Sequence, residues 1–159
     1  MSKFQTDYAG HIYKHGCLLC SIVTAAEQLV SCELSDETFL DMVDYLHFEK
    51  HAAYDSLIPV LSDEDDTSKG GSFVWDHAAV FDETFKRLGA FHKVLYTGRI
   101  YMPWEEKKGH TSFGERKGDI LILQIKTPNG GHFRGIDHDP YRPGTKMVDL
   151  KSLRFYTLV

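Results

Sequence analysis

The segment that decides the fold is GCLLCSIVTAAEQLVS, residues 16–31. From Cys17 onward, apolar residues recur at both helical spacings, so they cover nearly every side of a helix. A helix without a broad polar face is expected to lie at the centre of the molecule. Gly16 precedes this helix and permits a tight turn into it. The sequence therefore predicts a central helix with Cys17 at its N-terminus.

Two further helices are predicted on either side of a charged segment. Ser35 is a suitable N-cap for an amphipathic helix that runs to about His47 and packs on the first one. Asp76 can cap another helix, which ends at Gly89. Between them, the stretch SDEDDTSKGGS, residues 62–72, combines a run of carboxylates with paired glycines. It is expected to be an exposed loop.

After Gly89 the pattern changes to short segments rich in β-forming residues. These segments are HKVLYT from His92, DILILQIK from Asp119, GHFRGID from Gly131, KMVDL from Lys146 and RFYTL from Arg154. Pro and an Asn-Gly pair between the second and the third predict a hairpin turn at residues 127–131. The predicted fold class is α+β, with N-terminal helices and a central helix packed on a C-terminal antiparallel sheet. We expect residues 1–159 to form a single domain.

Charge and hydropathy narrow the classes of partner. The formal net charge is -5 and the sequence pI is about 6.0, so there is no basic surplus to neutralise a phosphate backbone. We therefore expect no nucleic-acid partner. The first residues, MSKFQTDYAG, lack the apolar core of a signal peptide, and no later run approaches the roughly 20 apolar residues of a membrane helix. The expectation is a cytoplasmic protein without a membrane partner, and the sequence does not indicate its oligomeric state.

Cysteine and histidine chemistry provides the candidate active site. A thiol attacks a carbonyl as thiolate, and a helix N-terminus favours the thiolate form, so Cys17 is a candidate nucleophile. His132 opens a strand directly after the predicted hairpin turn, which presents its imidazole at the rim of the sheet. Asp139, seven residues later and followed by Pro140, can accept the second imidazole N–H and fix the tautomer. Asp137 is a rival for this role, although strand alternation places it on the face opposite to His132.

These segments resemble a known family. GCLLCSIVTAAEQL, from Gly16, resembles the nucleophile helix "GCxxTSxAMxL" of the double-glycine (bacteriocin-processing) peptidase-like branch of the papain-like cysteine peptidase superfamily, of bacterial or bacteriophage type. KGDILILQI, followed by GGHF and DPY, resembles the histidine strand of that branch and the Asp-Pro after it.

The resemblance implies a papain-like thiol protease or related hydrolase that cleaves an amide or isopeptide bond in a peptide or protein. Cys17 would be the nucleophile, His132 the general base and acid, and Asp139 the orienting carboxylate. Gln5, twelve residues before Cys17, would supply an oxyanion-hole donor. This chemistry requires no cofactor.

Three alternatives remain at this stage. His11, His15, Cys17 and Cys20 have spacings at which zinc binds, but no second paired cluster completes a structural zinc site, so no metal is expected. The C-x-x-C pair could be a redox motif, but the strand that should precede it is not indicated. The same fold could also serve as a non-catalytic binding or inhibitor module that recognises a peptide or host protein. High thiol reactivity of Cys17 would favour the enzyme over this module.

Overall fold

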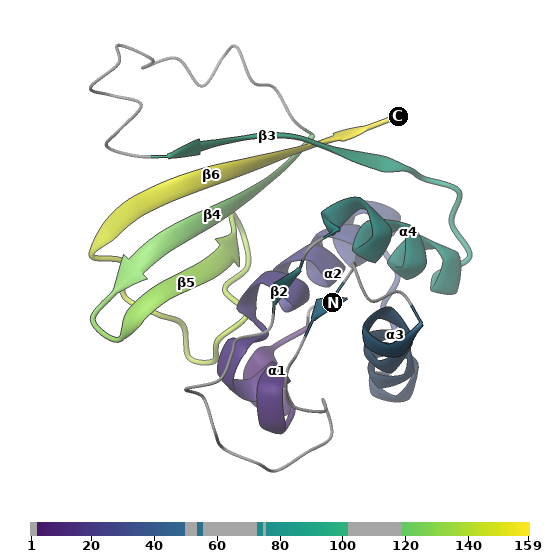
Figure 1. Ribbon diagram of the computed structural model, residues 1–159, viewed down its shortest axis with the longest axis horizontal. Helices are drawn as coiled ribbons and strands as arrows, with labels where there is room; N and C mark the ends of the chain where they lie inside the picture. The colour runs from purple at the N-terminus through teal and green to yellow at the C-terminus, as the bar shows by residue number, and fades with distance from the viewer. Residues whose placement is uncertain (1–2, 50–53, 56–72, 75, 102–118) are drawn as a thin grey trace.

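The computed structural model describes residues 3–49, 54–55, 73–74, 76–101 and 119–159. The predicted loop at 62–72 lies outside the described residues. The elements are η1 (Gln5–Asp7), α1 (Gly10–His15), α2 (Cys17–Val30), α3 (Asp36–Phe48), β1 (Tyr54–Asp55), β2 (Phe73–Val74), α4 (His77–Arg87), β3 (Val94–Tyr101), β4 (Ile120–Thr127), β5 (Gly130–Gly135) and β6 (Asp149–Leu158). They form an α+β structure in which the helices gather beside the larger sheet (Figure 1).

The larger sheet has the strand order β3-β6-β4-β5, and all neighbouring strands are antiparallel. The predicted hairpin is confirmed, because β4 and β5 pair from Thr127 and Gly130 outward around a turn at Pro128 and Asn129. The Thr127 hydroxyl donates to the Gly130 carbonyl at 2.9 Å and closes the turn. β5 is therefore an edge strand, and it carries His132.

One prediction about the sheet was wrong. The segments starting at Lys146 and Arg154 do not form two strands, because a single strand, β6, runs through both from Asp149 onward. In the fold β6 is a central strand with partners on both sides, and the buried Ser152 hydroxyl donates to Gln124 Oε1 at 2.7 Å. The strand predicted from His92 begins at Val94 instead and extends to Tyr101.

The predicted helices are confirmed together with their caps. The Ser35 hydroxyl accepts a hydrogen bond from the Thr38 N–H, and the Asp76 carboxylate accepts one from the Ala79 N–H. The packing of α3 differs from the expectation, since it lies against α4 and not mainly along α2. The short elements η1, α1, β1 and β2 were not predicted.

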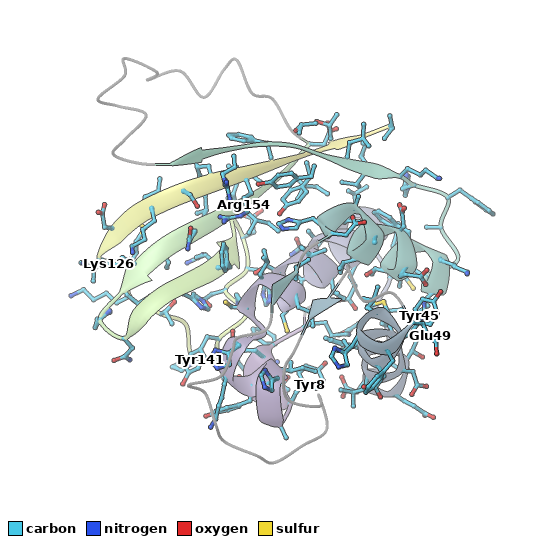
Figure 2. All side chains as sticks on the ribbon, in the orientation of Figure 1. Tyr8, Tyr45, Glu49, Lys126, Tyr141 and Arg154 are labelled. Carbon is cyan, nitrogen blue, oxygen red and sulfur yellow. The ribbon has the colours of Figure 1, made fainter. Side chains whose placement is uncertain are left out.

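α2 is the central helix, as expected, and packs against both α4 and β5. Its buried apolar residues join the core that lies between the helices and the inner face of the sheet; they are Leu18, Leu19, Cys20, Ile22, Val23 and Ala26. Alternate residues of β4 and β6, including Ile122 and Tyr156, supply the sheet side of this core. Figure 2 shows side chains filling the space between the sheet and the helices. None of the helices within the described ranges has the length and apolar character needed to cross a lipid bilayer.

A buried ion pair fixes the start of the chain. Lys3 Nζ lies 2.9 Å from Glu27 Oε2, and both side chains are almost completely buried. The Lys3 ammonium also donates to the Leu34 carbonyl at 2.6 Å, and the Lys3 carbonyl accepts from His138 Nε2 at 3.0 Å. Burial raises the pKa of Glu27, although the Lys3 ammonium opposes this. Lys3 thus connects α2 with the segment that precedes Asp139.

Replacement of Lys3 by methionine is expected to lower the free energy of unfolding by about 3 kcal/mol, because it leaves the Glu27 carboxylate buried without its partner. Urea denaturation of Lys3→Met measures the loss. The double variant Lys3→Met, Glu27→Leu should regain most of it, since the uncompensated charge is then gone. A single variant as stable as the native protein would contradict this interpretation.

Candidate active site

Cys17 is the first residue of α2, and Gly16 alone separates this helix from α1. The first N–H groups of a helix have no intrahelical acceptor, so they are available at Cys17. A Cβ atom at position 16 would lie 2.5 Å from the Ile12 carbonyl oxygen and 2.9 Å from Ile12 Cα. Only glycine fits this close approach, and the approach sets where the Cys17 side chain begins.

Gly16→Ala should therefore displace the start of α2. We expect a loss of stability of about 1–3 kcal/mol, the usual cost of an added methyl group in a packed site, and slower alkylation of Cys17. Thermal unfolding and the alkylation rate measure the two effects. Gly89→Ala serves as the control, because that position meets no atom within 4 Å and is remote in sequence from Cys17, although its positive φ carries its own strain. Unchanged Cys17 reactivity in Gly16→Ala would show that the close approach of Gly16 to Ile12 does not position the thiol.

A serine connects α2 with the strand that carries His132. Ser21 is buried, and its hydroxyl donates to the Cys17 carbonyl at 2.7 Å. The same hydroxyl lies 3.4 Å from the carbonyl oxygen of Phe133, the residue after His132. The N-terminal turn of α2 is thereby held against β5, which brings the two sequence-distant parts of the candidate site together.

His132 connects the thiol with a carboxylate. Its Nε2 lies 2.7 Å from Asp139 Oδ1, and the two side chains are 8% and 11% exposed. An ionised carboxylate only accepts hydrogen bonds, so Nε2–H is the donor. The Cys17 side chain is among the groups close enough to raise the pKa of His132, and Nδ1 is the ring nitrogen that Asp139 leaves free. The structure therefore brings Cys17, His132 and Asp139 together in one site.

Asp139 is held by its own loop. Its Oδ1 accepts the Tyr141 N–H at 2.9 Å across Pro140, which is an Asx-turn. Its Oδ2 accepts both the backbone N–H and the hydroxyl of Thr145, each at 2.8 Å. Asp137 is exposed and does not contact His132 in the described structure. The geometry thus selects Asp139 over its rival.

The protonation of the pair follows from these contacts. Burial lowers the pKa of His132, but the hydrogen bonds with Asp139 and Cys17 and the charges of both residues outweigh it and raise the pKa to about 9. Burial raises the pKa of Asp139, but the hydrogen bonds from His132, Tyr141 and Thr145 hold it well below its ordinary value. At neutral pH the site therefore contains an imidazolium beside a carboxylate.

Gln5 occupies a position next to both halves of the site. Its side-chain Nε2 donates to the Tyr13 carbonyl at 2.8 Å, in the helix that leads to Cys17. Its backbone N–H donates to the Pro140 carbonyl at 2.8 Å, in the loop that carries Asp139. The side-chain amide of Gln5 has two N–H groups, and the hydrogen bond to Tyr13 uses one of them. Gln5 is not a member of the group formed by Cys17, His132 and Asp139.

The residues of the zinc alternative are dispersed. The rings of His11 and His15 lie 5.8 Å apart, whereas Cys20 is completely buried in the core and Cys17 belongs to the site around His132. Within the described ranges, no group of three or more His, Cys, Asp or Glu side chains is arranged to hold a metal ion. Cys17 and Cys20 are both free thiols, and a helix rather than a strand precedes them.

Thr145 is the residue of the site that the sequence interpretation missed. The only local signal for Thr145 is the Asp-Pro turn, because an aspartate in such a turn accepts hydrogen bonds from N–H groups of the residues that follow it. The site can pass a proton between a thiol and an imidazole that a carboxylate keeps in one orientation.

Searches of protein-family models, curated proteins and solved structures found no match to this chain.

Proposed function

We propose that the protein is a papain-like cysteine hydrolase that cleaves an amide or isopeptide bond in a peptide or protein. The observation that carries the proposal is the position of His132, which is hydrogen-bonded to Asp139 through Nε2 and whose pKa is raised by Cys17 as well as by Asp139. A nucleophile, a base within hydrogen-bonding distance and a group that orients the base are the requirements for covalent acyl transfer.

In the resting site His132 already holds the proton that Cys17 has given up, so the reaction begins from a thiolate beside an imidazolium. The thiolate sulfur bonds to the substrate carbonyl carbon, and the carbonyl oxygen becomes an oxyanion. The Cys17 backbone N–H and the remaining amide N–H of Gln5 are the donors proposed for this oxyanion. His132 then gives its proton to the leaving amine as the C–N bond breaks, which leaves a thioester on Cys17.

Hydrolysis of the thioester completes the cycle. His132 removes a proton from water, the resulting hydroxide bonds to the thioester carbon, and the C–S bond breaks to release the acid and the Cys17 thiolate, which again faces the imidazolium. Asp139 keeps Nε2–H directed at itself, so Nδ1 stays directed at the thiol in both steps. Its three hydrogen bonds from Tyr141 and Thr145 restrain it in that position.

Digestion of a degenerate peptide mixture tests the proposal. The native protein should create new peptide termini that mass spectrometry detects, and Cys17→Ala should create none. Cys32→Ser is the matched control, because Cys32 is an exposed thiol outside the site, and it should cleave like the native protein. If neither native nor control protein cleaves and Cys17 behaves as an ordinary thiol, the hydrolase proposal fails and a non-catalytic binding or inhibitor module takes its place.

A further inference from the structure

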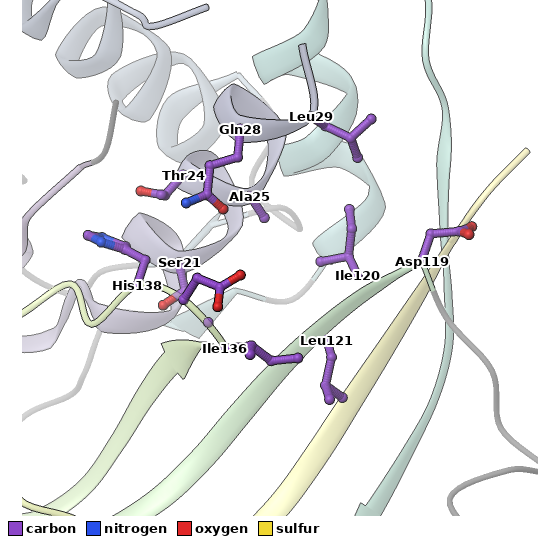
Figure 3. A pocket seen from close by; sticks show the side chains of 12 residues that line it. Ser21, Thr24, Ala25, Gln28, Leu29, Asp119, Ile120, Leu121, Ile136 and His138 are labelled. Carbon is purple, nitrogen blue, oxygen red and sulfur yellow. The ribbon is translucent and has the colours of Figure 1, made fainter. Parts of the chain in front are cut away.

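A pocket of about 280 Å³ lies beside α2, one helical turn beyond Cys17 (Figure 3). Its lining comes from one side of α2, on which Ser21 and Thr24 are buried and Gln28 is exposed, from the beginning of β4, and from the end of β5 with the loop after it. Ser21, at one end, is the residue whose hydroxyl donates to the Cys17 carbonyl. The loop residues Gly135–His138 connect the His132 strand with Asp139. The pocket thus adjoins the catalytic residues without including them.

The charged groups of this pocket are acidic. Its lining contains Asp119 and Asp137 and neither lysine nor arginine. The Asp119 carboxylate accepts the Leu158 N–H at 2.8 Å and is directed away from α2 (Figure 3). Asp137 is exposed and has no hydrogen-bond or ion-pair partner among the described residues. Burial lowers the pKa of His138, so that imidazole adds no positive charge at neutral pH.

The remaining lining combines apolar and polar groups. Leu29, Leu121 and Ile136 supply apolar surface, and Ile136 is 57% exposed although it belongs to the wall of the pocket. Gln28 extends from α2 toward the loop that carries His138 (Figure 3). A lining that contains a carboxylate, an amide group and apolar side chains suits a group with an aliphatic stem and a cationic end. The lysine side chain has this composition.

We infer that the pocket binds an aliphatic primary ammonium group, namely a lysine side chain of the substrate. The methylene stem packs on Ile136 and Leu121, and the ammonium donates to the Asp137 carboxylate and the Gln28 amide oxygen. That the lysine belongs to a substrate rests on the proposed hydrolase function, because only that function places a peptide beside Cys17. The binding of an ammonium group does not depend on it.

An NMR titration of the whole protein with N-acetyl-lysine methylamide tests the inference. Saturable shifts are expected at the backbone amides of Gln28, Ile136 and Asp137. N-acetyl-norleucine methylamide, which keeps the aliphatic stem and lacks the ammonium, should bind more weakly. Asp137→Asn should weaken the lysine probe by about threefold to fivefold, the range of one solvent-accessible ion pair. Asp149→Asn, an exposed aspartate near the opposite end of the β4–β6 ladder, should leave binding unchanged.

The outcomes separate this inference from the proposed function. Equal binding of the two probes, unchanged binding in Asp137→Asn, or no saturable shifts would each overturn the ammonium site. Cys17→Ala should bind the lysine probe like the native protein, because Cys17 does not line the pocket. Probe binding in a protein that fails to cleave peptides would uphold the pocket and reject the hydrolase.

Discussion

Cys17→Ala is expected to abolish the turnover of an activated ester such as p-nitrophenyl acetate, and His132→Ala to reduce it by about a hundredfold to ten-thousandfold. Without the sulfur no thioester forms. Without the imidazole the proton has no acceptor beside the thiol, and general acid–base catalysis supplies a rate factor of this size. Release of p-nitrophenol after the first equivalent measures turnover.

Two exposed residues provide the controls for these variants. Cys32→Ser removes an exposed thiol, and His92→Ala removes an exposed imidazole. Both should retain the native rate, which separates site chemistry from adventitious acylation of surface groups. Turnover that persists in Cys17→Ala would place the nucleophile elsewhere.

Asp139→Asn is expected to lower the pKa of His132 from about 9 to its ordinary value or below it. The largest influence on this ring is burial, which lowers its pKa, and the first of the opposing influences is the hydrogen bond to the Asp139 carboxylate, to which the charge of Asp139 adds. At neutral pH the variant ring is then mostly uncharged, so ester turnover should fall together with the pKa. NMR titration of isotope-labelled histidine follows His132 directly.

Asp137→Asn is the matched control for this prediction, since it removes a nearby carboxylate that does not contact His132. It should leave the pKa of His132 at about 9. Cys17→Ser isolates the share of the pKa shift that the thiol contributes. If the pKa of His132 stays at about 9 in Asp139→Asn, or falls in Asp137→Asn, Asp139 is not the residue that orients His132.

The same pair determines how stability should vary with pH. The folded pKa of His132 is raised, so its contribution is complete below its ordinary value of 6.5 and is lost as the pH rises through about 9. The folded pKa of Asp139 is lowered, so its contribution is present above its ordinary value of 3.8 and is lost as the pH falls below that. Asp139→Asn should flatten both limbs of the stability profile of the native protein.

Local signals account for the parts of the fold that the sequence predicted. The central helix follows from apolar residues on every side of 17–30, and the starts of α3 and α4 follow from the capping side chains of Ser35 and Asp76. The hairpin that presents His132 follows from its turn residues. These features each depend on a few neighbouring residues, so a single sequence contains enough information for them.

Long-range contacts account for what could not be predicted. Whether Lys3 reaches Glu27 depends on the whole path of the N-terminal segment, and no periodicity reveals it. The segments predicted from Lys146 and Arg154 join into one strand because β6 pairs with β3 on one side and β4 on the other along its length. Alternation does not separate Asp139 from Asp137, contrary to the prediction that it favours Asp139, because they lie five and seven residues after His132 and both offsets are odd. The choice is made by the chain, which leaves the strand after Gly135 and turns back through an Asx-turn.

The pH dependence of Cys17 alkylation by iodoacetamide tests the central claim most directly, in the native protein and in His132→Ala, with Cys20→Ser and Cys32→Ser as the common background. A thiolate held by an imidazolium reacts at pH 6, where an ordinary thiol is almost entirely protonated. The catalytic pair predicts rapid alkylation at pH 6 that is lost in His132→Ala. Slow alkylation at pH 6 in both proteins would contradict the pair, and with it the assignment of the chain as a cysteine hydrolase.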